Sequence, residues 1–331
     1  MININRLVVE MNLKNEESHE IEGIGKIYLK KDGKIPYLLY IPEKLDDKER
    51  LVVEVNNRET DRKYDLVNQA ASTMFSSYAV LSGRAPVLVP IIPSGENKPY
   101  YQQLSRDAFY EKEPLHVEEE VSKAIKDSLK IIEEEKGVKL DDKVFMKGYS
   151  SSGVFAQRFA LFHPEQIDTL LVGGASGSIP IPSNNIDYPL GIGGLKDFDS
   201  EAYSKIKFRY YVGEFETVNY AQDRQDVVDG KIIDIPMPMH DMTYFPRSIN
   251  PYTGKKYREY FGEDYFRRVD NVVKLYEDLG LDIKHTVIED RAHKSMMVGN
   301  IFYEGINELN DKIIDDAYKE SVKVLVDSRT K

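Results

Sequence analysis

The chain lacks cysteine altogether, and this absence removes several kinds of chemistry. None of its 331 residues is a cysteine. Disulfide bonds, a catalytic thiolate and a cysteine-ligated zinc site are therefore excluded. The absence of cysteine fits a cytoplasmic protein, and it fits equally well a secreted bacterial enzyme that avoids the residue.

Long apolar runs are also missing. No stretch approaches the roughly 18 consecutive apolar residues that a membrane-spanning helix needs. The first residues, MININRLVVEMN, lack the basic stretch followed by an apolar run that is typical of a secretory signal. We therefore expect no membrane span and a cytoplasmic location, and secretion is the alternative if a signal peptide has been removed.

Positive charge is scarce relative to negative charge. The chain has 45 Lys and Arg against 56 Asp and Glu, which gives a formal net charge of −11 at pH 7. An acidic surface repels the phosphates of nucleic acids and anionic lipids. Because no Lys/Arg cluster is dense enough to reverse this repulsion, we predict no nucleic acid partner and no membrane partner. The oligomeric state stays open.

Short β-rich runs separated by turn residues open the chain. This pattern occurs in INRLVVEMNL, GKIYLKKDGK and IPYLLYIPE, with turn residues such as Asp32-Gly33 between them. It predicts antiparallel strands at the edge of a sheet. We therefore assign residues 1–45 to an N-terminal β extension.

Beyond residue 45, apolar strands alternate with amphipathic helices. Buried strands are expected in ERLVVEVNN, APVLVPIIP, KVFMKG, DTLLVGGA, KIKFRYYVGE and DIKHTVIED. Helices are expected over 63–81 and 115–136 and in SGVFAQRFALF and VDNVVKLYEDLG. This alternation predicts an α/β domain with a mostly parallel central sheet and helices on both faces. Since no repeat or low-complexity linker interrupts it, we assign residues 1–331 to one domain.

Three consecutive serines lie between a predicted strand and a predicted helix, in KGYSSSG. Such a turn lies at the carboxyl edge of an open α/β sheet, where catalytic groups gather. A nucleophilic serine there needs small neighbours, as in the pattern G-x-S-x-G, because the strand and the helix approach closely. Ser150 fits, since Gly148 lies two residues before it and Ser152 two residues after it. Tyr149 and Val154 would crowd the other two serines.

The helix that follows the turn supplies a second element. The backbone N–H of Ser151 lies at its start, where partial positive charge would stabilise an oxyanion beside the Oγ of Ser150. The alternative is a Ser/Gly-rich helix cap without chemistry, since such caps are common. We favour Ser150 as a nucleophile because the strand, the turn and the helix occur together.

A serine hydroxyl is a weak nucleophile unless a base takes its proton, and His293 is the predicted base. It follows the last predicted strand in the loop EDRAHKSMM, so it lies at the same sheet edge as Ser150. His163 is thirteen residues beyond Ser150 along the helix, roughly 20 Å away. His285 lies on one face of a predicted strand and is typical of a packed histidine. A surface-loop role is the alternative for His293.

A carboxylate should orient the histidine, and it should follow a strand between Ser150 and the last strand. The segment RYYVGEFETVNYAQDRQD provides the candidates. We favour Glu216, which lies three residues beyond Gly213 near the strand end, and Glu214 and Asp223 are alternatives. Solvated loop charge is the interpretation without a catalytic role.

A second oxyanion donor and a pocket complete the predicted site. The run VVEVNNRE ends a central strand, so a backbone N–H near Asn57 is the candidate donor. Residues 219–265 are rich in Tyr, Phe, Pro and Met and lie between the acid and the base, so we expect a lid there. Tyr149, His240 and Met242 are assigned to the substrate pocket. A peripheral subdomain that packs on itself is the alternative.

The segment KVFMKGYSSSGVFAQRFALFHPEQIDTLLVGGASG resembles the nucleophile strand, turn, helix and next strand of the α/β-hydrolase superfamily. Its G-x-S-x-S-G variant with RFALFHPEQ is similar to bacterial esterases of the polyhydroxyalkanoate depolymerase and feruloyl esterase type. The resemblance covers about residues 50–110 and 143–178, and the order of residues extends it to His293. It implies the α/β-hydrolase fold and a triad of Ser150, Glu216 and His293. Ser152 replaces the second glycine of the family pattern.

The predicted activity is that of a serine hydrolase that cleaves a carboxylic ester through an acyl-enzyme intermediate. The expected partner is a small-molecule ester, and the reaction needs no cofactor and no metal. An acyltransferase or a peptidase would use the same three residues. A binding protein on a degenerate hydrolase fold is a further alternative, in which His293 would not reach Ser150.

Overall fold

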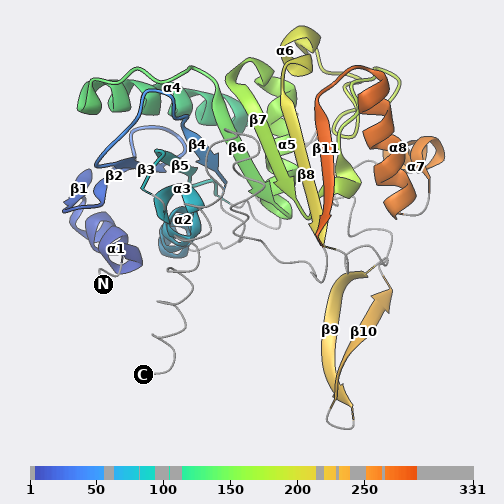
Figure 1. Cartoon of the computed structure of the whole chain (residues 1–331), viewed down its shortest axis with the longest axis horizontal. Helices are drawn as coiled ribbons and strands as arrows, with labels where there is room; N and C mark the ends of the chain where they lie inside the picture. Colours follow the sequence, from blue (N-terminus) through green and yellow to red (C-terminus); the bar gives the residue numbers. More distant parts are fainter. Residues whose placement is uncertain are drawn as a thin grey trace.

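A nine-stranded sheet forms the centre of the computed structural model, which describes residues 4–55, 63–81, 83–93, 104, 114–213, 220–228, 231–238, 251–262 and 265–288. The strand order is β1-β2-β3-β5-β4-β6-β7-β8-β11 (Figure 1). These strands are β1 (Ser18–Ile21), β2 (Gly25–Lys30), β3 (Tyr37–Pro42), β4 (Val52–Glu54), β5 (Val87–Pro90), β6 (Val144–Tyr149), β7 (Ile167–Gly173), β8 (Lys207–Gly213) and β11 (Ile283–Ile288).

The sheet changes from antiparallel to parallel at β5. Strands β1, β2, β3 and β5 pair antiparallel, and β5, β4, β6, β7, β8 and β11 pair parallel. The predicted mostly parallel sheet with an antiparallel N-terminal edge is therefore confirmed. Because parallel strands end at one edge, β4, β6, β7, β8 and β11 deliver the chain to a common carboxyl edge.

Helices cover both faces of the sheet (Figure 1). They are α1 (Ile4–Lys14), α2 (Lys63–Ser76), α3 (Tyr78–Leu81), α4 (Val117–Lys136), α5 (Ser151–Phe162), α6 (Ser200–Ser204), α7 (Pro251–Phe261) and α8 (Tyr265–Asp278), with short 3₁₀ turns η3 (Pro164–Gln166) and η4 (Ser176–Ser178). The helix expected over 115–136 is confirmed, and the helical stretch expected over 63–81 is divided at Ser77 into α2 and α3. Gly137 ends α4 in the left-handed conformation, with φ 65°, which glycine adopts without steric cost.

Two large apolar cores form in the described residues because successive strand residues point to opposite faces. In β6, Val144 and Met146 belong to the core that α4, α5 and α8 cover. Phe145 belongs to the core that α1 and α2 cover. The central strands are thus apolar on both faces, which explains their continuous apolar sequences.

The prediction of a strand over INRLVVEMNL is wrong, because residues 4–14 form the helix α1. The Val-rich run favours a strand, but apolar residues at positions 7, 8 and 11 have helical spacing. Val8 and Met11 are fully buried in the core that α1 shares with α2. Packing of this apolar stripe therefore overrides the strand propensity of the valines.

The region 219–265, expected to be a lid, divides into two parts. Strands β9 (Tyr220–Val228) and β10 (Lys231–Pro238) form an antiparallel pair separate from the main sheet, and Figure 1 shows this hairpin extending away from the rest of the fold. In contrast, α7 packs into the main body, where Tyr257 is fully buried. A lid role thus remains a prediction for the first part only.

Buried tyrosines join the helices α6, α7 and α8 to the segment that follows β7. The Tyr276 hydroxyl donates to the carbonyl of Pro180 and lies 2.8 Å from the Tyr203 hydroxyl. Tyr257 donates to the carbonyl of Ile179 at 2.9 Å. Burial raises the pKa of all three phenols, so each remains protonated and able to donate.

Replacing Tyr276 by Phe should lower the free energy of unfolding by about 1–3 kcal/mol, since the buried Pro180 carbonyl loses its donor. Urea unfolding measures the change. Tyr260→Phe is the matched control because Tyr260 is 59% exposed, and it should unfold like the unsubstituted chain. Equal stability of the two variants would contradict the prediction.

An ion pair joins β8 to the residue before β11 at the amino edge of the sheet, opposite the carboxyl edge. Arg209 in β8 holds Asp282 through two contacts, Nη1 to Oδ1 at 2.8 Å and Nη2 to Oδ2 at 3.1 Å. This bidentate hydrogen bonding lowers the pKa of the Asp282 carboxyl below its ordinary value. A pKa that is lower in the folded state stabilises the fold above the unfolded pKa, about 3.9 for Asp.

We expect Asp282→Asn to lose stability relative to the unsubstituted chain at pH 6, and the difference to shrink as the pH falls below about 4. The reason is that protonation of Asp282 in acid removes the pairing that the substitution also removes. Urea unfolding at pH 6 and pH 3 tests this. A difference that stays constant between the two pH values would contradict it.

Candidate active site

The turn between β6 and α5 holds Ser150 in a strained backbone conformation. Its φ is 53° and its ψ is −118°, a region that costs a residue with a side chain about 1–3 kcal/mol. The Ser150 N–H donates to the carbonyl of Gly173 at 2.8 Å, and the Ser150 carbonyl accepts from the N–H of Val154 at 3.0 Å. These bonds to β7 and α5 hold the serine at the carboxyl edge of the sheet.

Gly148 allows the strand and the helix to approach at this turn. A Cβ at this position would lie 2.3 Å from the Ser152 carbonyl oxygen and 2.7 Å from the Gly153 nitrogen. Both atoms belong to the backbone of α5 and cannot rotate away. The close approach predicted for the neighbours of Ser150 is thus present on its amino side.

Ser152 stands where the family pattern has its second glycine, and its hydroxyl forms hydrogen bonds within the turn. Its Oγ accepts from the N–H of Tyr149 at 2.8 Å and donates to the carbonyl of Tyr149 at 2.9 Å. The side chain is buried. Ser152 therefore braces the turn with its hydroxyl, whereas Ser150 and Ser151 are partly exposed.

Ser151 is the first residue of α5. The first N–H groups of a helix have no acceptor within that helix and carry partial positive charge. The backbone N–H of Ser151 therefore lies beside Ser150 at the positive end of α5. This is the place that the sequence predicts for an oxyanion donor.

Tyr149 supports the turn from the core that α1 and α2 cover. Its ring stacks on the ring of Tyr211, with centroids 6.2 Å apart and an interplanar angle of 27°. Gly173 makes room for this pair, since a Cβ there would lie 2.0 Å from the Tyr211 ring. The Tyr149 side chain is thus a packed element beneath Ser150, and its role in a pocket remains a prediction.

Strands β8 and β11, which precede the predicted acid and base, end two residues beyond the level at which β6 ends. Tyr149 pairs with Gly173, Gly173 with Tyr211, and Gly213 with Ile288. Neighbouring strands are about 4.8 Å apart, so β6 and β11 are separated by roughly 14 Å. A chain of five residues spans up to about 17 Å.

Glu216 and His293 lie three and five residues beyond the ends of β8 and β11, outside the described residues. Their roles therefore remain predictions. Asn57, His240, Met242 and Glu214 also lie outside the described residues. Asn57 lies three residues beyond the end of β4, the strand next to β6.

His285 lies within β11, as expected of a packed histidine. Burial lowers the pKa of its imidazole, which favours the neutral ring. Within the described ranges, no three His, Asp or Glu side chains converge in the way that a metal site requires. Among the helices in that part of the chain, none is both long and apolar enough to cross a membrane.

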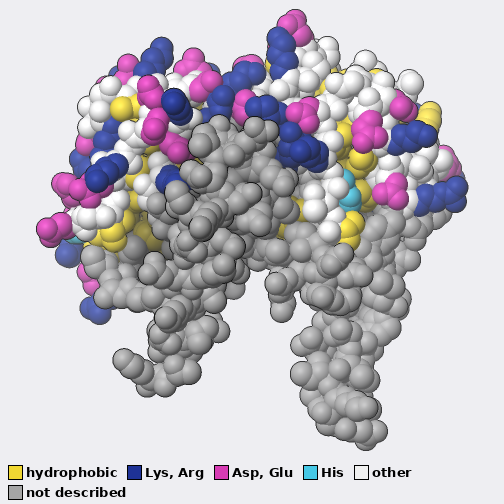
Figure 2. Space-filling view, in the orientation of Figure 1, with side chains coloured by type: hydrophobic (Ala, Val, Ile, Leu, Met, Phe, Trp, Pro, Cys, Tyr) yellow, Lys and Arg dark blue, Asp and Glu magenta, His cyan; other side chains and the backbone are white. Residues whose placement is uncertain are grey.

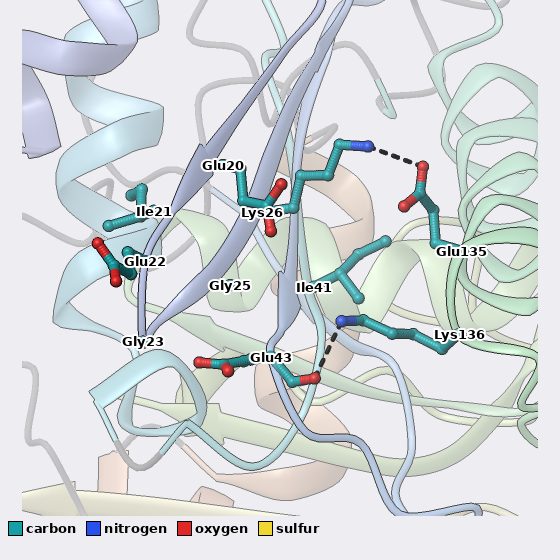
Figure 3. A pocket seen from close by; sticks show the side chains of 10 residues that line it. All are labelled: Glu20, Ile21, Glu22, Gly23, Gly25, Lys26, Ile41, Glu43, Glu135 and Lys136. Atoms are coloured by element: carbon teal, nitrogen blue, oxygen red, sulfur yellow. Dashed lines mark hydrogen bonds and ion pairs between the residues drawn. The ribbon is translucent and has the colours of Figure 1, made fainter.

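A cavity of about 310 Å³ lies at the other end of the sheet (Figure 3). The turn between β1 and β2, the end of β3 and the last turn of α4 line it. Lys26 pairs with Glu135 at 2.8 Å, and Lys136 donates to the Glu43 carbonyl at 3.0 Å. None of the predicted site residues lines this cavity, so it is separate from the turn at Ser150.

No protein-family model matches the chain, and no curated protein matches its sequence. A comparison of structures does find solved proteins that are similar to it. Poly(aspartic acid) hydrolase-1 from Sphingomonas sp. KT-1 is 15% identical over 83% of this chain and 95% of its own, with a TM-score of 0.49. LpqC, a poly(3-hydroxybutyrate) depolymerase from Bordetella parapertussis, is 14% identical over 96% and 99%, with a TM-score of 0.49. An esterase from Pyrobaculum calidifontis is 12% identical over 96% and 91%, with a TM-score of 0.39.

The fold itself is that of the α/β hydrolases, and the chain's own topology shows it. The sheet is parallel except at its N-terminal edge, helices cover both faces, and the chain order alternates strands and helices. A strained serine turn joins a central strand to a helix, as in the nucleophile turn of that fold. This confirms the fold that the sequence resemblance implies.

We predict that Gly148→Ala lowers the free energy of unfolding by at least about 1–3 kcal/mol, because the new Cβ forces α5 away from β6. Thermal or urea unfolding measures the loss. Gly33→Ala is the control: its nearest atom would be the flexible Glu120 Oε2 at 3.3 Å. A Gly148→Ala variant as stable as the control would contradict the close approach at the turn.

Proposed function

We propose that this chain is a serine hydrolase that cleaves a carboxylic ester. The observation that carries the proposal is the strained backbone of Ser150 at the turn between β6 and α5. Strain of this kind persists only where the surroundings impose it, and it is concentrated at functional sites. A serine that needed only to cap a helix would have no reason to adopt it.

In the proposed reaction, the Oγ of Ser150 attacks the ester carbonyl while His293 takes its proton. The backbone N–H of Ser151 and an N–H near Asn57 stabilise the resulting oxyanion. Collapse of this intermediate breaks the bond to the alcohol, which leaves with the proton from His293. Water, activated by His293, then attacks the acyl-enzyme and releases the carboxylic acid. These groups suffice without a cofactor.

Glu216 is the proposed carboxylate that orients His293. It follows β8 by three residues, and β8 pairs in register with β11, the strand that precedes His293. Asp223, an alternative, lies within β9 in the hairpin that extends away from the sheet. This placement favours Glu216 over Asp223, and Glu214 remains the second candidate.

The substrate pocket is proposed to form above the carboxyl edge. His240 and Met242 follow the β9–β10 hairpin, in the part of the chain between the acid and the base. Soft, adaptable methionine and an aromatic-rich segment suit an apolar acyl or alcohol group. We therefore propose a small-molecule ester with an apolar part as the substrate.

Ser150→Ala should lower kcat for p-nitrophenyl butyrate on the order of 10³-fold or more, and it should leave the fold intact. It should also abolish reaction with a fluorophosphonate, which intact mass and peptide mapping detect on the unsubstituted chain as one adduct at Ser150. The control, Ser204→Ala on the exposed surface of α6, should behave like the unsubstituted chain.

Three outcomes would change the assignment. Unchanged turnover in folded Ser150→Ala would show that another group performs the reaction. Faster transfer of the acyl group to an added alcohol or amine than to water would indicate an acyltransferase. A folded chain with no fluorophosphonate adduct and no turnover would favour a binding protein on a hydrolase fold.

A further inference from the structure

A buried ion pair joins two neighbouring strands of the sheet close to the turn that holds Ser150. Glu54, the last residue of β4, and Lys147 in β6 face each other in register. The Lys147 Nζ lies 3.1 Å from the Glu54 Oε1, and their side chains are only 12% and 7% exposed. The hydroxyl of fully buried Ser77, between α2 and α3, donates to the same oxygen at 2.5 Å.

Apolar side chains of the described residues lie beside this cluster. Alternation along β4 and β6 places Glu54 on the same face as Val52, and Lys147 on the same face as Phe145. Val52, Phe145 and Met74 all belong to the core that α1 and α2 cover. Burying two charges there costs desolvation free energy, and an apolar pair of similar size is often as stable or more stable. Fold stability alone therefore does not account for the cluster.

The cluster lies where the pairing between β4 and β6 ends. Only three residue pairs join these strands, and Glu54 with Lys147 is the last of them. Beyond this pair the two chains continue toward Asn57 on one side and toward Ser150 and Ser151 on the other. The ion pair is therefore the last link of this ladder before the two segments that are proposed to hold the oxyanion.

Ser77 fixes the same carboxylate from the helical layer. Its N–H bonds back to the carbonyl of Met74 at the end of α2, at 3.2 Å, so the serine is itself held in place. Glu54 is thus restrained by β6 within the sheet and by the α2–α3 junction above it. Such restraint limits sliding and tilting of the end of β4 relative to β6.

We infer that Glu54 and Lys147 are positioning residues that set the position of the end of β4 relative to the nucleophile turn after β6. The inference rests on the proposed function, since it concerns the geometry of the oxyanion site. Neither side chain touches the substrate. Their effect is on the rate at which Ser150 becomes acylated, because a misplacement of about 1 Å at a site of this kind can cost up to about 10²-fold.

The test replaces both charges, with Glu54→Gln and Lys147→Met in one chain. The amide retains an acceptor for Ser77, and methionine retains most of the length of the lysine stem. We expect the midpoint of thermal unfolding to stay within about 3 °C. Fluorophosphonate labelling of Ser150 should become about 10-fold slower, and kcat for p-nitrophenyl butyrate should fall by a similar factor while KM changes little.

The chain offers a matched control in an ion pair far from the edge. Lys26 in β2 and Glu135 in α4 lie 2.8 Å apart and are 28% and 35% exposed. Lys26→Met with Glu135→Gln makes the same chemical change and should label at the unsubstituted rate. A folded Glu54→Gln, Lys147→Met chain that labels as fast as this control would overturn the inference.

Charge reversal provides the rescue. Glu54→Lys with Lys147→Glu restores opposite charges at the same register position and should recover at least part of the labelling rate. If the first double variant does not fold, Ser77→Ala decides, since it retains both charges and removes one restraint. We expect labelling about 3-fold slower in that variant, and an unchanged rate would overturn the inference. No labelling of the unsubstituted chain would instead overturn the proposed function.

Discussion

The hydrogen bond from the Ser150 N–H to the Gly173 carbonyl is the contact on which the rest of the site depends. It ties the turn after β6 to the end of β7, at a residue whose backbone is strained. Without such a bond, a serine with φ 53° would relax toward an ordinary helix start. Because β6 and β7 are neighbours in the sheet, this bond fixes the backbone of Ser150, and with it the position of the Ser150 hydroxyl.

The same turn is also supported by the residues packed around it. Gly148 leaves room for the backbone of α5, and Ser152 closes the turn with two hydrogen bonds. Gly173 leaves room for the ring of Tyr211, on which Tyr149 stacks. Each feature removes one way in which the strain could be released, and together they over-determine the conformation of Ser150.

Figure 2 shows Lys and Arg interspersed with Asp and Glu over the described part of one face of the molecule. An even distribution of this kind matches the absence of a dense basic cluster in the sequence. The proposed function rests instead on the strained turn at Ser150.

The strands and helices of the central fold could be predicted from the sequence because their signals are local. Apolar runs bounded by turn residues predicted β6, β7 and β8, and helical spacing with a following glycine predicted α4. Helix α1 was missed because its valines favour a strand, while its packing on α2 became known only from the structure. Ser150 could be chosen among three serines because the decisive neighbours, Gly148 and Ser152, are adjacent in sequence.

Contacts between distant residues could not be predicted in this way. Glu54 and Lys147 are 93 positions apart, and in the sequence each is a single charged residue within an apolar run. Their pairing depends on β4 lying between β5 and β6, an order that local patterns do not contain. A charge in a strand that is otherwise buried on both faces is nevertheless a signal, since it must find a partner or remain costly.

That signal also explains how a hydrolase fold can combine a stable body with a strained site. The apolar layers on both faces provide most of the free energy of folding, and the hydrophobic effect that drives their burial is non-directional. A directional ion pair with a third hydrogen bond is sensitive to such shifts. Glu54 and Lys147 form the last of the three residue pairs between β4 and β6. Their ion pair therefore fixes the relative position of the two strand ends, which non-directional packing alone does not fix.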